Sequence, residues 1–120
     1  MEEIIKKRFF DVAVRIYNAL DVIKYPHPAA DVKRQLLRSS TSAAANYRAA
    51  CRAKSASDFL NKLKIVEEET DETMFWLDFL TEIGVKIECH HEITKELNEL
   101  ISIIVTSIKT TRNRINRKSN

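Results

Sequence analysis

The chain has 120 residues, of which 44% are hydrophobic and 31% charged, and this composition fits one globular domain with a modest core. One Gly and two Pro are too few for strands joined by tight turns. No apolar run approaches the roughly 18 residues of a membrane span, so we expect no membrane association.

The start of the chain, Met1-Glu2-Glu3, lacks the apolar stretch of a secretory signal. We therefore expect a cytoplasmic protein in which Cys51 and Cys89 are reduced thiols.

The first expected helix covers residues 2–24. Its apolar stripe recurs at steps of three or four residues and consists of Ile5, Phe9, Val12, Ile16, Leu20 and Ile23. Phe10, Ala13 and Tyr17 widen this stripe, so we expect them to face the core as well. Two prolines in the segment 25–28 predict the end of the helix.

The second expected helix covers residues 29–53. Asp31 lies near its start, where the helix dipole favours a carboxylate. Every side chain from Ser39 to Ala45 is small, which allows a neighbouring helix to approach closely. The hydroxyl groups in this segment can bond to carbonyls one turn earlier, so they tolerate burial.

The third expected helix covers residues 56–83. Ser55 fits the N-cap and Asp58 the N3 position, and Gly84 fits a left-handed residue after the last turn. The expected inner stripe consists of Phe59, Leu63, Val66, Thr70, Met74, Leu77 and Leu80. A second apolar strip, Trp76, Phe79 and Ile83, lies beside it. A small bundle cannot bury both, so we expect the second strip to form an oligomer interface.

The fourth expected helix covers residues 88–114, followed by a basic tail, 115–120, that we expect to fray. Its stripe consists of Ile93, Leu97, Leu100, Ile104, Ile108 and Ile115, broadened by Ile101 and Val105. Four helices with short connections predict an all-α fold, an antiparallel up-down four-helix bundle in a single domain of residues 1–120. With about 25 residues per helix, the bundle should be roughly 35–40 Å long.

Candidate chemical sites are few. Glu88 and His91 form one Glu-x-x-His motif, whereas di-iron bundles use two copies, so we expect no metal and no cofactor. Cys51 lies on an apolar face, and no glycine elbow or oxyanion loop accompanies either cysteine. These observations favour a protein that is not an enzyme and has no catalytic residues.

Charge is distributed unevenly along the chain. Residues 31–54 hold six cations and one acid, residues 58–92 hold three cations and ten acids, and residues 109–120 hold five cations and no acid. Such asymmetry is typical either of a surface for an anionic partner or of solvated and mutually paired helix faces. The candidate nucleic-acid-binding residues are Arg34, Arg38, Arg48 and Arg52, which share one sector of the second helix, and Arg112, Arg114, Arg117 and Lys118 of the tail. In the alternative, the acids of the third helix occupy Arg38 and Arg48.

The stretch 35–77 resembles the four helix bundle protein family, whose members are encoded in intervening sequences of bacterial 23S rRNA genes. The resemblance rests on Gln35 to Ser39, Ala45-Asn46-Tyr47, Ser55-x-x-Asp58-Phe59, Lys62-Leu63, Glu67 to Glu69, and Glu72 with Trp76-Leu77. It implies a homopentameric up-down bundle, and kinship with the nucleic-acid-binding accessory protein of diversity-generating retroelements. It implies no catalytic residue. The resulting hypothesis is a non-enzymatic oligomer that binds RNA or DNA through a basic face, and the alternative is a structural or protein-interaction oligomer without nucleic-acid binding.

Overall fold

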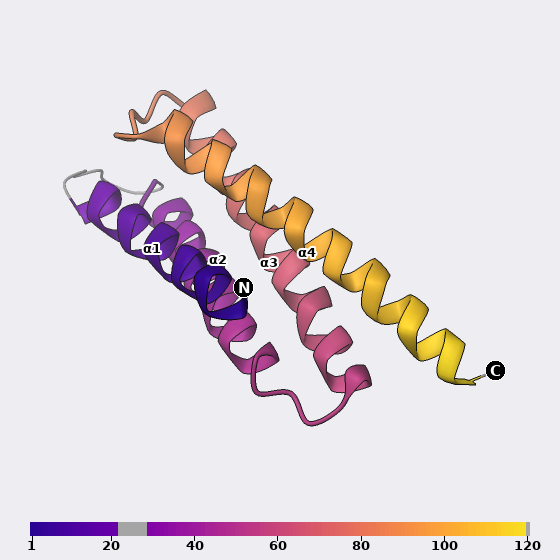
Figure 1. Ribbon diagram of the computed structural model, residues 1–120. Helices are drawn as coiled ribbons and strands as arrows, with labels where there is room; N and C mark the ends of the chain where they lie inside the picture. Colours follow the sequence, from indigo (N-terminus) through magenta and orange to yellow (C-terminus); the bar gives the residue numbers. More distant parts are fainter. Residues whose placement is uncertain (22–28, 120) are drawn as a thin grey trace.

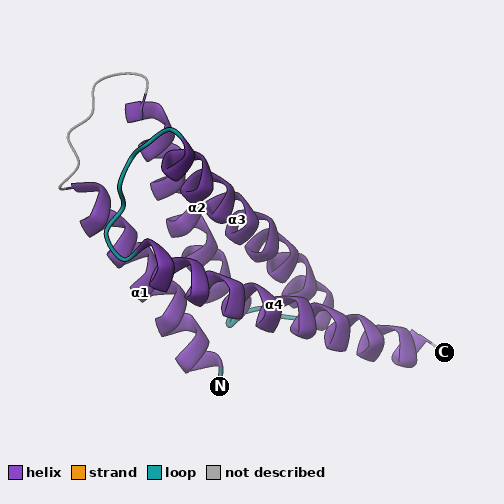
Figure 2. Cartoon of the chain, turned by 90° about the horizontal axis from the view of Figure 1, so that it is seen from above, coloured by secondary structure: helices purple, strands orange, loops and turns teal. Residues whose placement is uncertain are grey.

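The computed structural model describes residues 1–21 and 29–119, and these residues form four helices (Figure 1). The helices are α1 (Glu2–Asp21), α2 (Ala29–Ala50), α3 (Ala56–Glu82) and α4 (His90–Ser119). No strand occurs in the described part of the chain (Figure 2). The predicted all-α class and four-helix bundle are therefore confirmed.

The helices are arranged so that each contacts its neighbours in the chain, and α1 and α4 close the bundle through a smaller contact. Figure 1 shows that each helix runs antiparallel to the one before it. The molecule measures 56 × 22 × 21 Å, longer than the 35–40 Å expected. The reason is α4, whose 30 residues span about 45 Å and whose last turns extend past α1 and α2 (Figures 1 and 2).

The limits of α2 and α4 differ from those predicted. The second helix ends at Ala50 instead of residue 53, and Cys51 and Arg52 form a turn, so Arg52 is not part of α2. The fourth helix starts at His90 and continues through Ser119, so the tail expected to fray is helical. No Gly or Pro interrupts it, and the cations of its last turns interact favourably with the negative end of the helix dipole. The expected end of the first helix at residues 25–28 lies outside the described residues.

The ends of α3 match the sequence expectations. The Asp58 N–H donates to Ser55 Oγ at 3.0 Å, and Asp58 Oδ2 accepts from the Lys54 N–H at 3.3 Å. Gly84 has φ +91°, the left-handed region in which glycine carries no steric cost. The Gly84 N–H then bonds to Thr81 O and the Val85 N–H to Leu80 O, which satisfies two terminal carbonyls of the helix.

The core contains most of the predicted inner stripes, but Val105, expected to broaden the stripe of the fourth helix, is 45% exposed. Its largest fully buried apolar side chains are Phe9, Ile5, Ile16, Leu36, Leu63, Leu77, Leu80, Ile93, Leu100, Ile104 and Val66. The expectation for Phe10 and Tyr17 was wrong, because they are 62% and 53% exposed. Both lie at the edge of the α1 stripe, where their side chains remain largely open to solvent.

Small polar side chains join α2 to α3. Ser39 and Thr73 are completely buried, and the Thr73 hydroxyl lies 2.9 Å from Ser39 Oγ and 2.8 Å from Glu69 O. Ser39 donates to Leu36 O at 3.2 Å, so its oxygen is free to accept from Thr73. The small residues of α2 thus provide the close helix approach that the sequence predicted.

The smaller α1–α4 contact carries a bidentate ion pair. Arg8 Nε donates to Glu96 Oε2 at 2.9 Å, and Arg8 Nη2 donates to Glu96 Oε1 at 2.6 Å. Glu99 Oε1 lies 3.7 Å from the same guanidinium and is more exposed. The hydrogen bonds and charge of Arg8 hold the pKa of the Glu96 carboxyl below its usual value.

This pair predicts a pH-dependent contribution to stability. The pKa of the Glu96 carboxyl is lower in the folded protein than its usual value of 4.5, so the ionised carboxylate stabilises the folded state at pH values above 4.5. This stabilisation is lost as the pH falls through the pKa that the carboxyl has in the folded protein. We expect Glu96→Gln to lower the free energy of unfolding at pH 7 by about 1 kcal/mol. Urea titrations between pH 7 and pH 3 should show this difference vanish in acid. Glu99→Gln is the matched control, and an equal loss in both variants would contradict the assignment.

Candidate functional site

Two of the eight candidate nucleic-acid-binding cations are engaged by acids of the same chain. Arg34 Nη1 lies 2.6 Å from Asp31 Oδ1, one turn earlier on α2. Arg38 donates to Glu72 of α3 and also lies 3.3 Å from Glu69 Oε2. A phosphate approaching Arg34 or Arg38 would have to compete with these carboxylates, and because both pairs are exposed that competition is weak.

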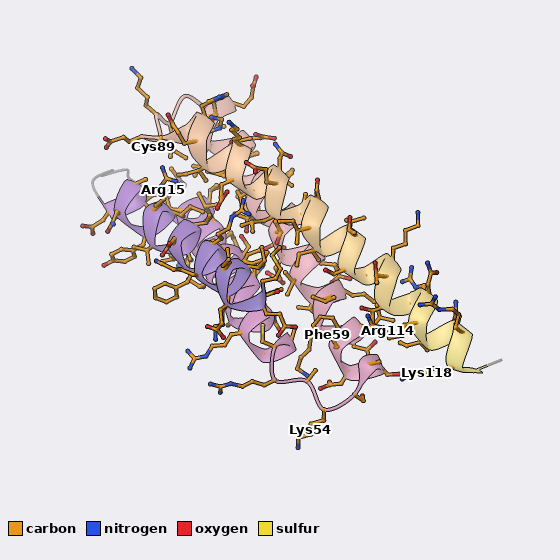
Figure 3. The ribbon with its side chains drawn as sticks, in the orientation of Figure 1. Arg15, Lys54, Phe59, Cys89, Arg114 and Lys118 are labelled. Carbon is orange, nitrogen blue, oxygen red and sulfur yellow. The ribbon has the colours of Figure 1, made fainter. Side chains whose placement is uncertain are left out.

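The other six candidates are exposed, and no ion pair involves them within residues 1–21 and 29–119. They are Arg48, Arg52, Arg112, Arg114, Arg117 and Lys118. Because α4 runs antiparallel to α3, its last turns lie at the end of the bundle where α2 ends and α3 begins (Figure 1). Lys54, exposed in the connection between α2 and α3, lies at this end as well (Figure 3). We call these seven residues the basic end.

The basic end was only partly anticipated. The sequence predicted that Arg34, Arg38, Arg48 and Arg52 share one sector of the second helix. Arg34, Arg38 and Arg48 do line one groove, whereas Arg52 lies in the turn after α2. Arg34 and Arg48 are 14 residues apart on α2, about 21 Å along its axis. Lys54 was not among the candidates predicted from the sequence. Its position just after Arg48 and Arg52, and just before the N-cap Ser55, could have suggested it. Figure 3 shows Arg114 and Lys118 on the last turns of α4, away from α1 and α2.

The predicted interface strip on α3 is largely exposed. Phe79 and Ile83 are 40% and 50% exposed, whereas Trp76 is half-buried and packs against the core. Phe75, which the sequence interpretation missed, is 56% exposed, and its ring centroid lies 4.9 Å from that of Trp76 and 6.2 Å from that of Phe79. We call Phe75, Trp76, Phe79 and Ile83 the aromatic strip.

A groove of about 1260 Å³ lies along α1 and α2. Its α1 wall contains the exposed side chains Ile4, Phe10, Val14 and Tyr17, and its α2 wall contains Leu37, Thr41, Ala44 and Ala45. Arg34, Arg38 and Arg48 also line it. The groove is therefore lined by apolar and cationic side chains together.

Neither candidate chemical cluster forms a site. Glu88 and His91 are exposed, and no group of three or more His, Cys, Asp or Glu side chains in the described part of the chain could hold a metal ion. Burial raises the pKa of the Cys51 thiol, which lies beside Tyr47, so little of the nucleophilic thiolate forms. No helix among the described residues is long and apolar enough to cross a membrane.

Comparison with known proteins places this architecture in a family. The family model described as "23S rRNA-intervening sequence protein" matches residues 1–106. A crystal structure from Bacteroides thetaiotaomicron, described as a protein with unknown function from the S23 ribosomal protein family, is similar. It is 30% identical, with 90% of this chain and 97% of that chain covered and a TM-score of 0.78. No curated protein matches. The chain therefore belongs to the 23S rRNA-intervening sequence protein family.

Proposed function

We propose that this chain is a non-enzymatic bundle protein that assembles with copies of itself and binds RNA or DNA through the basic end. The proposal rests on one observation: the eight candidate cations differ in whether an acid of the same chain already pairs with them. Two are occupied by carboxylates, whereas six are exposed without an ion pair in the described residues. These six and Lys54 belong to the segments at one end of the bundle: the last turn of α2, the connection to α3 and the last turns of α4.

The chemistry of the basic end suits phosphate. Five of its seven side chains are arginines, whose planar guanidinium can donate to two phosphate oxygens at once. Residues 109–120 contain no acid that would compete for these groups. Contacts of this kind read the backbone and not the bases, so binding is largely independent of sequence. Self-assembly, with five copies as the family resemblance implies, repeats the basic end and increases avidity.

A direct test measures fluorescence anisotropy of a labelled single-stranded RNA of mixed sequence from about 50 to 200 mM salt. The variant carries glutamine at Arg112, Arg114, Arg117 and Lys118. We expect it to bind roughly 100-fold more weakly at the lowest salt, and the slope of log affinity against log salt to fall by about 3.

A matched control removes four cations from the opposite end of the bundle. It carries glutamine at Arg15, Lys33, Lys86 and Lys95, so it has the same net charge as the first variant. We expect the control to bind like the wild type. Equal losses would show that net charge, and not the basic end, attracts RNA. No wild-type binding at about 50 mM salt, where charges are least screened, would contradict the proposal.

The second candidate function is a structural or protein-interaction oligomer without nucleic-acid binding. The ion pairs of Arg38 with Glu69 and Glu72 favour it, because they use basic and acidic helix faces to orient α2 on α3. It is the function that remains if the RNA experiment fails while self-association persists.

A further inference from the structure

Exposed apolar side chains gather on two faces of this chain. Ten large apolar residues are exposed in the described structure, and seven of them belong either to the groove or to the aromatic strip. The groove contributes Ile4, Phe10, Val14 and Tyr17, and the strip contributes Phe75, Phe79 and Ile83. Exposed apolar patches of this size are typical of interaction sites.

The two faces carry opposite charge. Five cations and the two acids Glu3 and Asp11 line the groove. Four of the cations, Lys6, Lys7, Arg34 and Arg38, are paired with acids of the same chain. Arg48 forms no ion pair within the described residues, so it is the groove cation available to an acid of a second copy. Residues 67–82 of α3, which contain most of the strip, hold seven acids and no Lys or Arg. Four of these acids, Glu68, Asp71, Asp78 and Glu82, are exposed and form no ion pair within the described residues.

We propose that the aromatic strip of one copy of this chain docks into the α1–α2 groove of a second copy. The inference rests on the self-assembly proposed above and specifies its two surfaces. A helix laid into an apolar groove is a recurring recognition mode. The strip from Phe75 to Ile83 extends about 12 Å along α3, and the groove wall from Ile4 to Tyr17 extends about 20 Å along α1, so the strip fits within it.

The charges argue against an interface in which two strips, or two grooves, pack against each other. If two strips packed together, the acids of two α3 helices would face each other, and two paired grooves would oppose their cations. Docking strip into groove instead brings Asp78 and Glu82 of one copy near cations such as Arg48 of the other. Such a contact joins two different surfaces, so each added copy leaves one groove and one strip unfilled until a ring closes.

The test uses two variants that each damage one face. The groove variant carries Phe10→Glu and Val14→Glu, and the strip variant carries Phe75→Glu and Phe79→Glu. All four side chains are at least 40% exposed, so the bundle should still fold. We expect each variant alone to be monomeric in size-exclusion chromatography with light scattering, with association weakened at least about 30-fold, as for loss of an interface hot spot. Val105→Glu, at a 45% exposed residue outside both faces, is the matched control and should assemble like the wild type.

Mixing the two variants provides the decisive measurement. The groove variant keeps an intact strip and the strip variant keeps an intact groove, so an equimolar mixture should form a complex of two chains and stop there. Recovery of binding on mixing also shows that both variants are folded. A mixture that stays monomeric, or either variant assembling alone like the wild type, overturns this inference.

Failure of self-assembly itself has a different signature. A wild-type chain that stays monomeric at about 100 μM would overturn both the proposed assembly and this inference. Assembly of the wild type without recovery in the mixture would overturn this inference only. RNA binding is read separately by anisotropy: loss of self-assembly should weaken it through lost avidity, whereas loss of the basic end should weaken it in assembled and monomeric protein alike.

Discussion

Replacing Phe9 by alanine should cost about 3–5 kcal/mol of the free energy of unfolding, a large share of the roughly 5–15 kcal/mol typical of a small domain. Phe9 is 2% exposed and stacks on Tyr47, with ring centroids 5.3 Å apart. The substitution removes the apolar contacts of the ring and leaves a cavity between α1 and α2. It also leaves Tyr47 without its aromatic neighbour, a contact worth about 0.5–1.5 kcal/mol. Urea denaturation at fixed protein concentration measures the change.

The neighbouring phenylalanine is the matched control. Phe10 is 62% exposed, so Phe10→Ala should cost less than about 1 kcal/mol. Both substitutions are best compared in the strip variant, which keeps self-association out of the measurement. Similar losses for Phe9→Ala and Phe10→Ala would contradict the burial pattern of α1.

Phe9 and Phe10 also show how far sequence periodicity predicts this fold. The spacing of three and four residues identifies the inner stripe, and Phe9 lies at its centre. Phe10 lies about 100° around the helix, at the edge of the stripe, where exposure depends on how the neighbouring helix is placed. That placement is a tertiary property, so the sequence could predict the core and not the groove.

For the candidate site too, the sequence predicts contacts between residues that are close in the chain, but not contacts that depend on how the helices pack. The pair between Arg34 and Asp31 joins residues one turn apart, so the sequence alone could have shown that Arg34 is occupied. The contact between Arg38 and Glu72 spans 34 residues. The sequence left that pairing open as an alternative for both Arg38 and Arg48, and the structure places it at Arg38. The sequence predicted the antiparallel order and six of the seven residues of the basic end, but it ended the fourth helix at residue 114, so it could not place the last cations on a continuous helix.

The close approach of α2 to α3 leads to the second large effect. Ser39 is completely buried and its oxygen lies 2.9 Å from the Thr73 hydroxyl across the helix contact. A leucine side chain at this position has no space, because protein cores are packed as densely as organic crystals. Leucine favours helix slightly more than serine does, so any loss of stability must come from packing between α2 and α3.

We expect Ser39→Leu to lower the free energy of unfolding by about 3 kcal/mol or more, the upper range for overpacked cores. Ser39→Ala, which removes only the hydroxyl, should cost about 1 kcal/mol. Ser102→Leu is the matched control, because Ser102 lies exposed on α4 and donates to Asn98 O at 3.0 Å, a similar bond back along the helix. Thermal and urea unfolding should show Ser102→Leu close to the wild type, because the added side chain enters solvent. If Ser39→Leu were equally harmless, α2 and α3 could not approach each other as closely as the buried hydroxyl pair requires.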